Sequence, residues 1–311
     1  MKRNMQRAAQ IVALGSAVFM STSAVAGLSN EQLLNILLEN GAINQAQYDE
    51  LAKLAQEDSE KAKEKLADEV KVSVKGGQLK FKSGDDEFKF QVGGRIMVDT
   101  AWYNADDNVD PSLDWGNGTE LRRARLFMKG TVWNNWHFKL QYDFAGDGEI
   151  KDAFIKYTGL KQYTDIPLDI IVGNYKEPFS LEELTSSKYI TFMERALPNA
   201  FAPGRNIGVG LNSYGNVLNG GWSAAAGWFT DGVDNENDDG NNESNAVAGR
   251  LTFAPIANKT EVVHFGGAVE YRNYDDSTIR FRSRPEAHTA EHRMVDTGSF
   301  LAQDTLKWGL E

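Results

Sequence analysis

From about residue 88 the chain alternates apolar and polar positions with a period of two. In the first such segment the apolar residues occupy the even positions Phe88, Phe90, Val92, Ile96, Val98 and Trp102. Polar residues occupy the odd positions Lys89, Gln91, Arg95 and Asp99. Successive side chains of a β-strand point to opposite faces, so this alternation predicts a strand with one apolar face and one polar face.

The alternation returns along most of the remaining chain. It predicts strands near residues 123–132, 137–144, 152–157, 168–172, 206–214, 222–229, 250–253, 263–272, 279–284 and 294–310, with a turn at Asn134-Asn135. About ten strands of this length, apolar on one side and polar on the other, are typical of a transmembrane β-barrel. In hydrocarbon every backbone polar group needs a partner, which only a helix or a closed sheet provides. Aromatic residues near the strand ends suit an interface belt: Trp102, Tyr103, Trp133, Trp136, Tyr157 and Trp228.

Before these strands lies a segment with helical periodicity. Leu33, Leu34 and Leu37 share one helical face, and Asn40-Gly41 is a helix stop. Asn44 can cap a second helix, which becomes rich in Glu and Lys towards Val70. We expect a short periplasmic helical segment over residues 27–70 that serves oligomer contact or wall anchoring. A solvated linker without a partner is the alternative.

The first 26 residues resemble a secretion signal. Lys2, Arg3 and Arg7 give a charged start, residues 11–20 are apolar, and Ala24-Val25-Ala26 suits the cleavage site. The predicted organisation is therefore a signal peptide (1–26), a helical segment (27–70) and an outer-membrane β-barrel (71–311).

Composition narrows the class of protein. The 311 residues contain no cysteine, which excludes disulfides and thiolate metal sites. Mean hydropathy is −0.46, and no apolar stretch after the N-terminus is long enough for a membrane helix. The net charge of −11 argues against a nucleic-acid partner. Enzyme and nucleotide motifs are absent from the sequence, and His288 and His292 lie beside Pro285 in a predicted loop. We expect no enzyme activity, no cofactor and no metal site.

The strongest local feature is Arg280-Phe281-Arg282-Ser283-Arg284. On one strand the three guanidinium groups would lie about 6–7 Å apart on the same face. Facing lipid, each would cost about 2–4 kcal/mol near the midplane, so this face is expected in the lumen. Guanidinium groups bind oxyanions in bidentate fashion, which predicts an anion track.

Other cations fall on predicted inner faces, whereas Arg122 is placed at the outer-face end of its strand. The inner set comprises Arg95, Arg123, Arg125, Arg250 and Arg272. Four lysines could add to the positive field or simply form a solvated lumen face, namely Lys129, Lys139, Lys151 and Lys156. An equally open interpretation is that these cations form salt bridges with lumen carboxylates such as Asp99, Asp143, Asp152 and Glu270.

Two long connections differ in character. Residues 231–245 are acidic and rich in Asn, as expected of a solvated external loop. Residues 177–203 are partly apolar and could either fold inward and narrow the lumen or pack over the mouth of the barrel.

Several motifs together resemble the phosphate-selective porin O/P family. The carrying stretches are 93–96 (GGRI), 121–125 (LRRAR), 172–179 (VGNYKEPF), 190–195 (ITFMER), 202–205 (APGR), 280–285 (RFRSRP) and 295–298 (VDTG). The resemblance implies trimeric sixteen-stranded barrels in the outer membrane with an arginine ladder that conducts phosphate or polyphosphate.

By motif match, Arg95, Arg122 and Arg123 would belong to this ladder, and Arg280, Arg282 and Arg284 match it more loosely. Asp152 resembles the family's acidic residue near the constriction. Arg125 departs from the pattern. The chain is also short for sixteen strands and ends without the usual terminal aromatic residue. We therefore expect a C-terminally incomplete barrel that, alone, forms an open curved sheet.

The functional hypothesis is passive diffusion of small anions, most plausibly phosphate or polyphosphate, through a trimer embedded in outer-membrane lipid. The anion track would comprise Arg95, Arg122, Arg123, Arg280, Arg282 and Arg284, with Arg125, Lys129, Lys139, Asp152, Arg250 and Arg272 as further lining residues. The alternatives are a general non-selective porin, a structural envelope barrel or, least favoured, an outer-membrane hydrolase.

Overall fold

The computed structural model describes residues 30–104, 108, 115, 117–233, 244–284 and 287–311. The chain divides into two compact units, Met1–Glu69 and Val70–Glu311. The predicted signal peptide and most of the acidic loop fall outside the described residues.

The first unit contains the two predicted helices, α2 (Asn30–Glu39) and α3 (Gln45–Ala67). Gly41 follows α2 with φ of 68°, a left-handed conformation that ends a helix without cost for glycine. The side chains of Asn44 and Gln47 each accept a 3.0 Å hydrogen bond from the other residue's backbone N–H. This reciprocal capping box fixes the start of α3 and confirms the predicted helical segment. Within the described residues, no helix is both long and apolar enough to cross a membrane.

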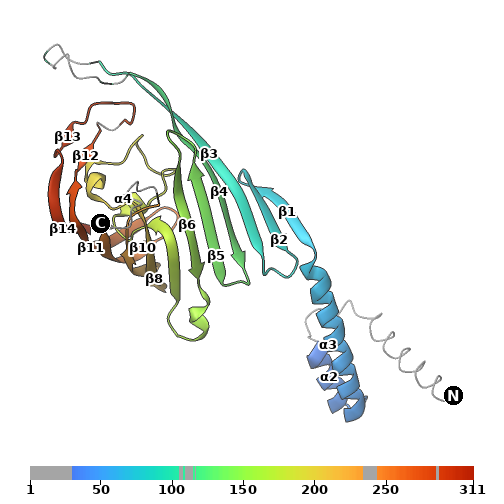
Figure 1. Cartoon of the computed structure of the whole chain (residues 1–311). Coiled ribbons are helices and arrows are strands. Elements are labelled where there is room, and N and C mark those ends of the chain that lie inside the picture. The colour runs from blue at the N-terminus through green and yellow to red at the C-terminus, as the bar shows by residue number, and fades with distance from the viewer. Residues whose placement is uncertain (1–29, 105–107, 109–114, 116, 234–243, 285–286) are drawn as a thin grey trace. The chain divides into compact units, whose positions relative to one another are not determined.

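The second unit is an antiparallel sheet of twelve strands in which each strand pairs with the next (Figure 1). The strands are β1 (Val70–Lys75), β2 (Gln78–Ser83), β3 (Lys89–Ala101), β4 (Gly118–Val132), β5 (Trp136–Asp143), β6 (Glu149–Tyr157), β7 (Leu168–Lys176), β8 (Arg205–Val217), β9 (Gly220–Phe229), β10 (Asn245–Ala257), β11 (Val262–Ile279) and β14 (Phe300–Leu310). Among the described residues β1 and β14 are the two edges and do not pair with each other. The all-β, antiparallel prediction is confirmed, and the sheet is open, as expected for this chain alone.

The two faces of the sheet are reversed relative to a water-soluble protein. Large apolar side chains are exposed, among them Ile96 (77%) and Leu251 (68%). Charged side chains such as Arg123, Glu270 and Arg272 are buried. Soluble proteins rarely bury charge or expose broad apolar surface. The outward face therefore suits hydrocarbon and the inward face suits a polar lumen.

Strands β1 and β2 were missed, because the predicted strands began at residue 88. A two-residue turn joins them, with Gly76 and Gly77 at φ of 62° and 69°. Positive φ at both central residues is the geometry that closes a tight hairpin, and glycine adopts it freely.

The predicted continuous strand over residues 279–284 is wrong, because the main sheet ends at Ile279 and only Arg282–Ser283 form a separate short strand. Strand β11 ends at Ile279, which pairs with Phe300, the first residue of β14. Beyond this pair β14 offers no partner. The chain instead forms a small hairpin between β12 (Arg282–Ser283) and β13 (Val295–Asp296). The strand predicted from residue 294 accordingly begins only at Phe300.

The loop between β7 and β8 contains a short helix, α4 (Leu181–Leu184), and a 3-10 turn, η2 (Leu197–Phe201). Another 3-10 turn, η1 (Gly159–Gln162), joins β6 to β7. The sheet is curved, and the segment after β11 reaches β4, where the His288 Nδ1 lies 2.7 Å from the Glu120 Oε2. Figure 1 shows α4 enclosed by this curvature.

We predict that Leu251→Arg destabilises the membrane-inserted protein by about 2–4 kcal/mol, because it places a charge on the lipid face near the middle of β10. Urea unfolding of the protein in lipid vesicles measures the loss. Thr252→Arg, on the opposite face of the same strand, is the matched control and should cost much less. Equal losses for the two variants would contradict the assignment of faces.

Candidate functional site

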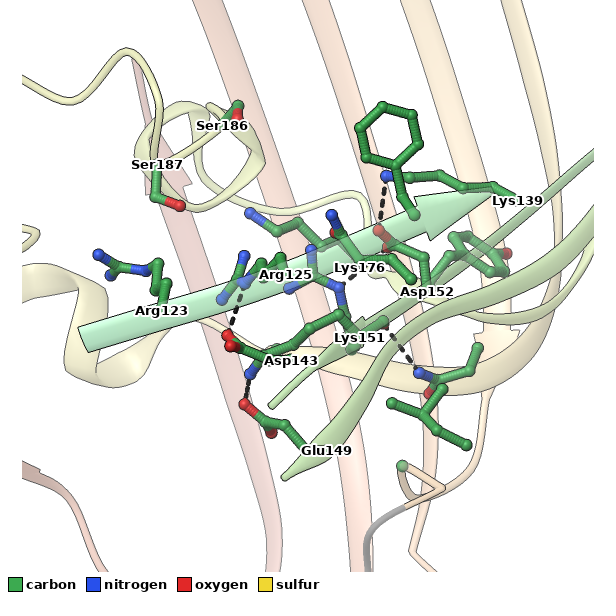
Figure 2. Close-up of a pocket in the computed structure, with 18 of the residues that line it drawn as sticks. Arg123, Arg125, Lys139, Asp143, Glu149, Lys151, Asp152, Lys176, Ser186 and Ser187 are labelled. Carbon is green, nitrogen blue, oxygen red and sulfur yellow. Dashed lines mark hydrogen bonds and ion pairs between the residues drawn. The ribbon is translucent and has the colours of Figure 1, made fainter. Parts of the chain in front are cut away.

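The concave side of the sheet holds a cavity of about 1250 Å³ (Figure 2). Strands β3 to β8 and the loop after β7 line it, and eleven Lys or Arg side chains face six Asp or Glu side chains. The cations are Arg95, Arg122, Arg123, Arg125, Lys129, Lys139, Lys151, Lys176, Lys188, Arg195 and Arg205. The acids are Glu120, Asp143, Glu149, Asp152, Glu183 and Asp231. The cavity is thus locally basic in a chain whose net charge is −11.

Residues 177–203 fold inward against the strands, which is the first of the two arrangements that the sequence left open. The Arg95 Nη2 on β3 donates a 2.7 Å hydrogen bond to the Ser187 Oγ in this loop. The Lys176 Nζ at the end of β7 lies 3.0 Å from the Glu183 Oε1. Arg195 donates hydrogen bonds to three backbone carbonyls of the same loop, those of Glu182, Glu183 and Thr185. The loop is therefore a folded part of the cavity wall.

Arg122 and Arg123 approach the same carboxylate, that of Glu194. The Glu194 Oε1 lies 2.5 Å from the Arg122 Nε and 3.6 Å from the Arg123 Nη2. Consecutive residues of a regular strand point to opposite faces, but Met97 pairs with Arg123 and Val98 pairs with Leu121, which leaves Arg122 without a partner in the ladder. This β-bulge turns Arg122 inward. The predicted outer-face position of Arg122 is wrong for this reason.

The charge of Glu194 is maintained by its neighbours. Burial raises the pKa of this carboxyl, but the hydrogen bond from Arg122 and the charges of Arg122 and Arg123 outweigh burial. The net result is a pKa below the usual glutamate value, and Glu194 is an anion at neutral pH.

Several predicted lining cations are paired with lumen carboxylates. The Arg125 Nε lies 2.6 Å from the Asp143 Oδ2, and the Lys139 Nζ lies 2.6 Å from the Asp152 Oδ2 (Figure 2). Asp152 also accepts a 3.0 Å hydrogen bond from the Arg205 Nε. Lys151 pairs with Glu149 in the cavity, whereas Lys156 pairs with Asp169 elsewhere on the sheet. For these cations the salt-bridge interpretation is correct.

Arg95 differs from the paired cations. Across the described residues no carboxylate forms a salt bridge with it, and the hydrogen bond of its guanidinium is to the Ser187 hydroxyl. Its Nε is buried and has no hydrogen-bond partner among the residues that the structure describes. Lys129 likewise makes no ion pair in the described structure, and its ammonium lies 5.7 Å from the Phe127 ring centroid. These two groups keep unused capacity to bind an anion.

Arg272 and Arg250 do not line the main cavity, although Arg272 lies 3.8 Å from Asp231, which does. Arg272 is buried at the centre of a network: its Nε lies 2.9 Å from the Glu270 Oε1, its Nη1 donates to the Ser244 Oγ, and it pairs with Glu177. Lys307 adds a 2.8 Å contact to the Glu270 Oε2. Arg250 forms a two-point ion pair with Glu311, at 2.9 and 2.5 Å.

The network also holds the start of the inward loop. Glu177 is the first residue after β7, and its Oε1 accepts a 2.5 Å hydrogen bond from the Asn206 Nδ2. Burial raises the pKa of Glu177, and the opposing charge of Arg272 only partly offsets this effect. The inward loop is thus anchored at its origin by charged side chains of β11 and β14.

The predicted row of Arg280, Arg282 and Arg284 does not form. Arg280 is exposed and pairs with Asp296, with its Nε 2.6 Å from the Oδ1. The Arg284 Nε donates to the Ala290 backbone carbonyl at 2.6 Å. Arg282 and Arg284 instead join Arg293 and Arg195 around a smaller cavity of about 180 Å³ that Glu194 also lines.

Comparison with known proteins shows the family of the chain. The family model for phosphate-selective porin O and P matches residues 90–311. The chain belongs to this family. It is 31% identical over 249 residues to an uncharacterized protein of Caulobacter vibrioides, covering 76% of this chain and 47% of that protein. It is 26% identical over 226 residues to Porin O of Pseudomonas aeruginosa, covering 70% of this chain and 49% of that protein.

Membership of this porin family makes the chain an outer-membrane protein with an all-β porin fold. The matched part begins within β3 and includes the complete cavity-lining loop. The chain spans about half the length of the curated relatives that it matches.

Several cavity residues are not among the site residues predicted from the sequence, and five of them are Lys176, Lys188, Glu194, Arg195 and Arg205. Four of them lie within the motifs that carry the porin resemblance, so the signal was present. Their proximity to Arg95 and Arg122 depends on the inward fold of residues 177–203, which periodicity alone does not specify.

We predict that Arg272→Ala lowers the free energy of unfolding by about 3–5 kcal/mol, because it leaves Glu177 and Glu270 buried without their shared partner. Denaturant titration in detergent micelles or vesicles measures the change. Arg280→Ala removes an exposed arginine from the same strand region and should leave the unfolding midpoint almost unchanged. A comparable shift in both variants would mean that the network does not anchor the loop.

Proposed function

We propose that this porin allows passive diffusion of small anions, with inorganic phosphate or polyphosphate as the preferred permeant, through the basic cavity under residues 177–203. The observation that carries the proposal is the excess of cations in that cavity, eleven against six acids, in an acidic chain. Permeant ions respond to the local field of the lining and not to the total charge.

The arrangement of the cations supports transit as well as binding. Most of the cavity cations are partly neutralised by carboxylates, such as Arg125 by Asp143 and Arg205 by Asp152. A passing anion can therefore be attracted without being held too tightly to leave. Arg95, Lys129 and Lys188 form no ion pair among the described residues and supply the unpaired charge. Ser186 and Ser187 lie beside the cavity (Figure 2), where hydroxyl groups can donate to an oxyanion.

Binding at Arg95 is favoured by the state of its guanidinium. A buried donor without a partner costs free energy, and an anion that reaches the Nε would remove that cost. Planar guanidinium groups bind tetrahedral oxyanions through two parallel hydrogen bonds, which favours phosphate over a spherical halide.

The wider assembly is part of the proposal. The family resemblance and the broad apolar outer face support a homotrimer in outer-membrane lipid. No enzyme activity and no cofactor are required for diffusion, and among the described residues no cluster of His, Asp and Glu suits a metal ion. A general non-selective porin and a structural envelope barrel are the competing functions.

We predict that Arg95→Gln weakens phosphate block of chloride current about tenfold, because one charge-assisted interaction is lost. Full-length protein in planar lipid bilayers gives the concentration for half block and, under a salt gradient, the reversal potential. Lys259→Gln, an exposed turn residue outside the cavity, makes the same charge change and should behave like the wild type. Cation preference of the wild-type pore would overturn the proposed function.

We also propose that residues 27–70 form a periplasmic unit that conduction does not need. Val70 already pairs with Ser83 in β1, so the strands begin one residue before the predicted barrel start at residue 71. The helical segment is a compact unit of its own. Deleting residues 28–69 behind the signal peptide should leave single-channel conductance and phosphate block unchanged. Loss of conductance in a deletion protein that still inserts into the membrane would favour the structural-envelope alternative.

A further inference from the structure

Glu194 occupies the place where an anion would meet Arg122 and Arg123. Its Oε1 lies 2.5 Å from the Arg122 Nε and 3.6 Å from the Arg123 Nη2. Both arginines line the main cavity, and Glu194 reaches them from the adjoining small cavity. The side chain is about one-fifth exposed, so solvent ions have access to the contact.

The loop holds Glu194 firmly in this position. The next residue, Arg195, donates hydrogen bonds to the carbonyls of Glu182 and Thr185, both at 2.9 Å. The following backbone N–H, that of Ala196, donates a 2.8 Å hydrogen bond to the Glu182 Oε1. The backbone is therefore fixed directly after Glu194, and the freedom that remains is in its own side chain.

A carboxylate and a phosphate compete for the same donors. Both are oxyanions that guanidinium groups bind through short, charge-assisted hydrogen bonds. Glu194 takes the Nε donor of Arg122 and offsets part of the positive charge that Arg122 and Arg123 would otherwise present to a permeating anion. Arg95 forms no ion pair with a carboxylate among the described residues. Its guanidinium is therefore open to an anion, whereas that of Arg122 already binds Glu194.

The bulge in β4 makes this competition possible. Arg122 has no ladder partner and turns inward beside Arg123, so two guanidinium groups converge on one carboxylate. In an unbroken strand only one of them would face the lumen. The pair therefore has the capacity for a polyvalent oxyanion, and a single carboxylate satisfies it only in part.

We propose that Glu194 is a tethered counter-anion that competes with permeating phosphate for Arg122 and Arg123 and so sets how tightly the pore holds its permeant. This inference rests on the proposed anion-pore function and adds a specificity-determining residue to it. Glu194 acts by release: an arriving phosphate displaces the carboxylate, and the carboxylate returns when phosphate moves on. The pore thereby gains turnover at the expense of affinity.

The test is Glu194→Gln in full-length protein in planar bilayers, with inorganic phosphate added to a chloride bath. Removing the competing charge should lower the phosphate concentration for half block about tenfold and shift the reversal potential towards stronger anion preference. Glu194→Asp, which keeps the charge, should stay near the wild type. Glu261→Gln, an exposed glutamate in the β10–β11 turn, controls for net charge and should change neither quantity.

A double variant protects the test against misfolding. Arg122→Gln with Glu194→Gln leaves a neutral pair, and the gain from the glutamate substitution should shrink in this background because its target is gone. If Glu194→Gln matches the wild type, or weakens phosphate block, the counter-anion role is wrong even though the pore is anion-selective. A full gain that persists without Arg122 would likewise overturn it. A wild-type pore without phosphate block or anion preference would instead reject the proposed function itself.

Discussion

The alternation of side chains along paired strands is the constraint on which the structure depends. Hydrocarbon offers no solvent partner for backbone N–H and C=O groups, so each strand must form hydrogen bonds with the strands beside it. With the backbone committed to the ladder, every second side chain points outward, as Ile96 and Leu251 do, and the remainder point inward. Charge must then be packed on one face. The crowding of Arg, Lys, Asp and Glu on the concave side follows from that geometry before any function is considered.

Crowded charges on the inner face are managed in two different ways. Around Arg272 the ions are buried and mutually satisfied, and they anchor the origin of the inward loop through Glu177. Buried pairs of this kind add specificity of arrangement more than net stability. Around the main cavity each buried carboxylate pairs with a more exposed cation, as Asp152 does with Lys139, and Arg95 forms no ion pair among the described residues. The first group fixes the shape of the lumen wall, and the second gives that wall its field.

Periodicity predicted much of this fold because period two is a direct consequence of the strand. It identified β3 to β11 and the apolar face of most of them, with Arg122 as an exception, and it identified the Asn44 cap of α3. The β1–β2 hairpin was also readable, since Val70, Val72 and Val74 alternate with polar residues before Gly76-Gly77. The alternating arginines of residues 280–284 predicted a strand that does not continue β11. A strand also needs a neighbour to pair with, and β14 begins only at Phe300, opposite Ile279. The contact between Arg272 and Glu177 joins residues 95 positions apart, and no local pattern specifies it.

The bulge at Arg122 shows how a local break in the alternation creates the functional arrangement. In the sequence Leu121-Arg122-Arg123-Ala124 the apolar positions are three apart instead of two, which is the signature of one extra residue in the strand. Had the register continued, one guanidinium would have faced lipid, which costs free energy that increases with depth in the membrane. The bulge removes that cost and doubles the positive charge at one point of the wall. A site with two convergent guanidinium groups would hold oxyanions strongly, and a pore cannot retain its permeant. The carboxylate of Glu194 can compete with the permeant for these arginines. It lies close enough to pair with both guanidinium groups and is exposed enough for an anion to displace it.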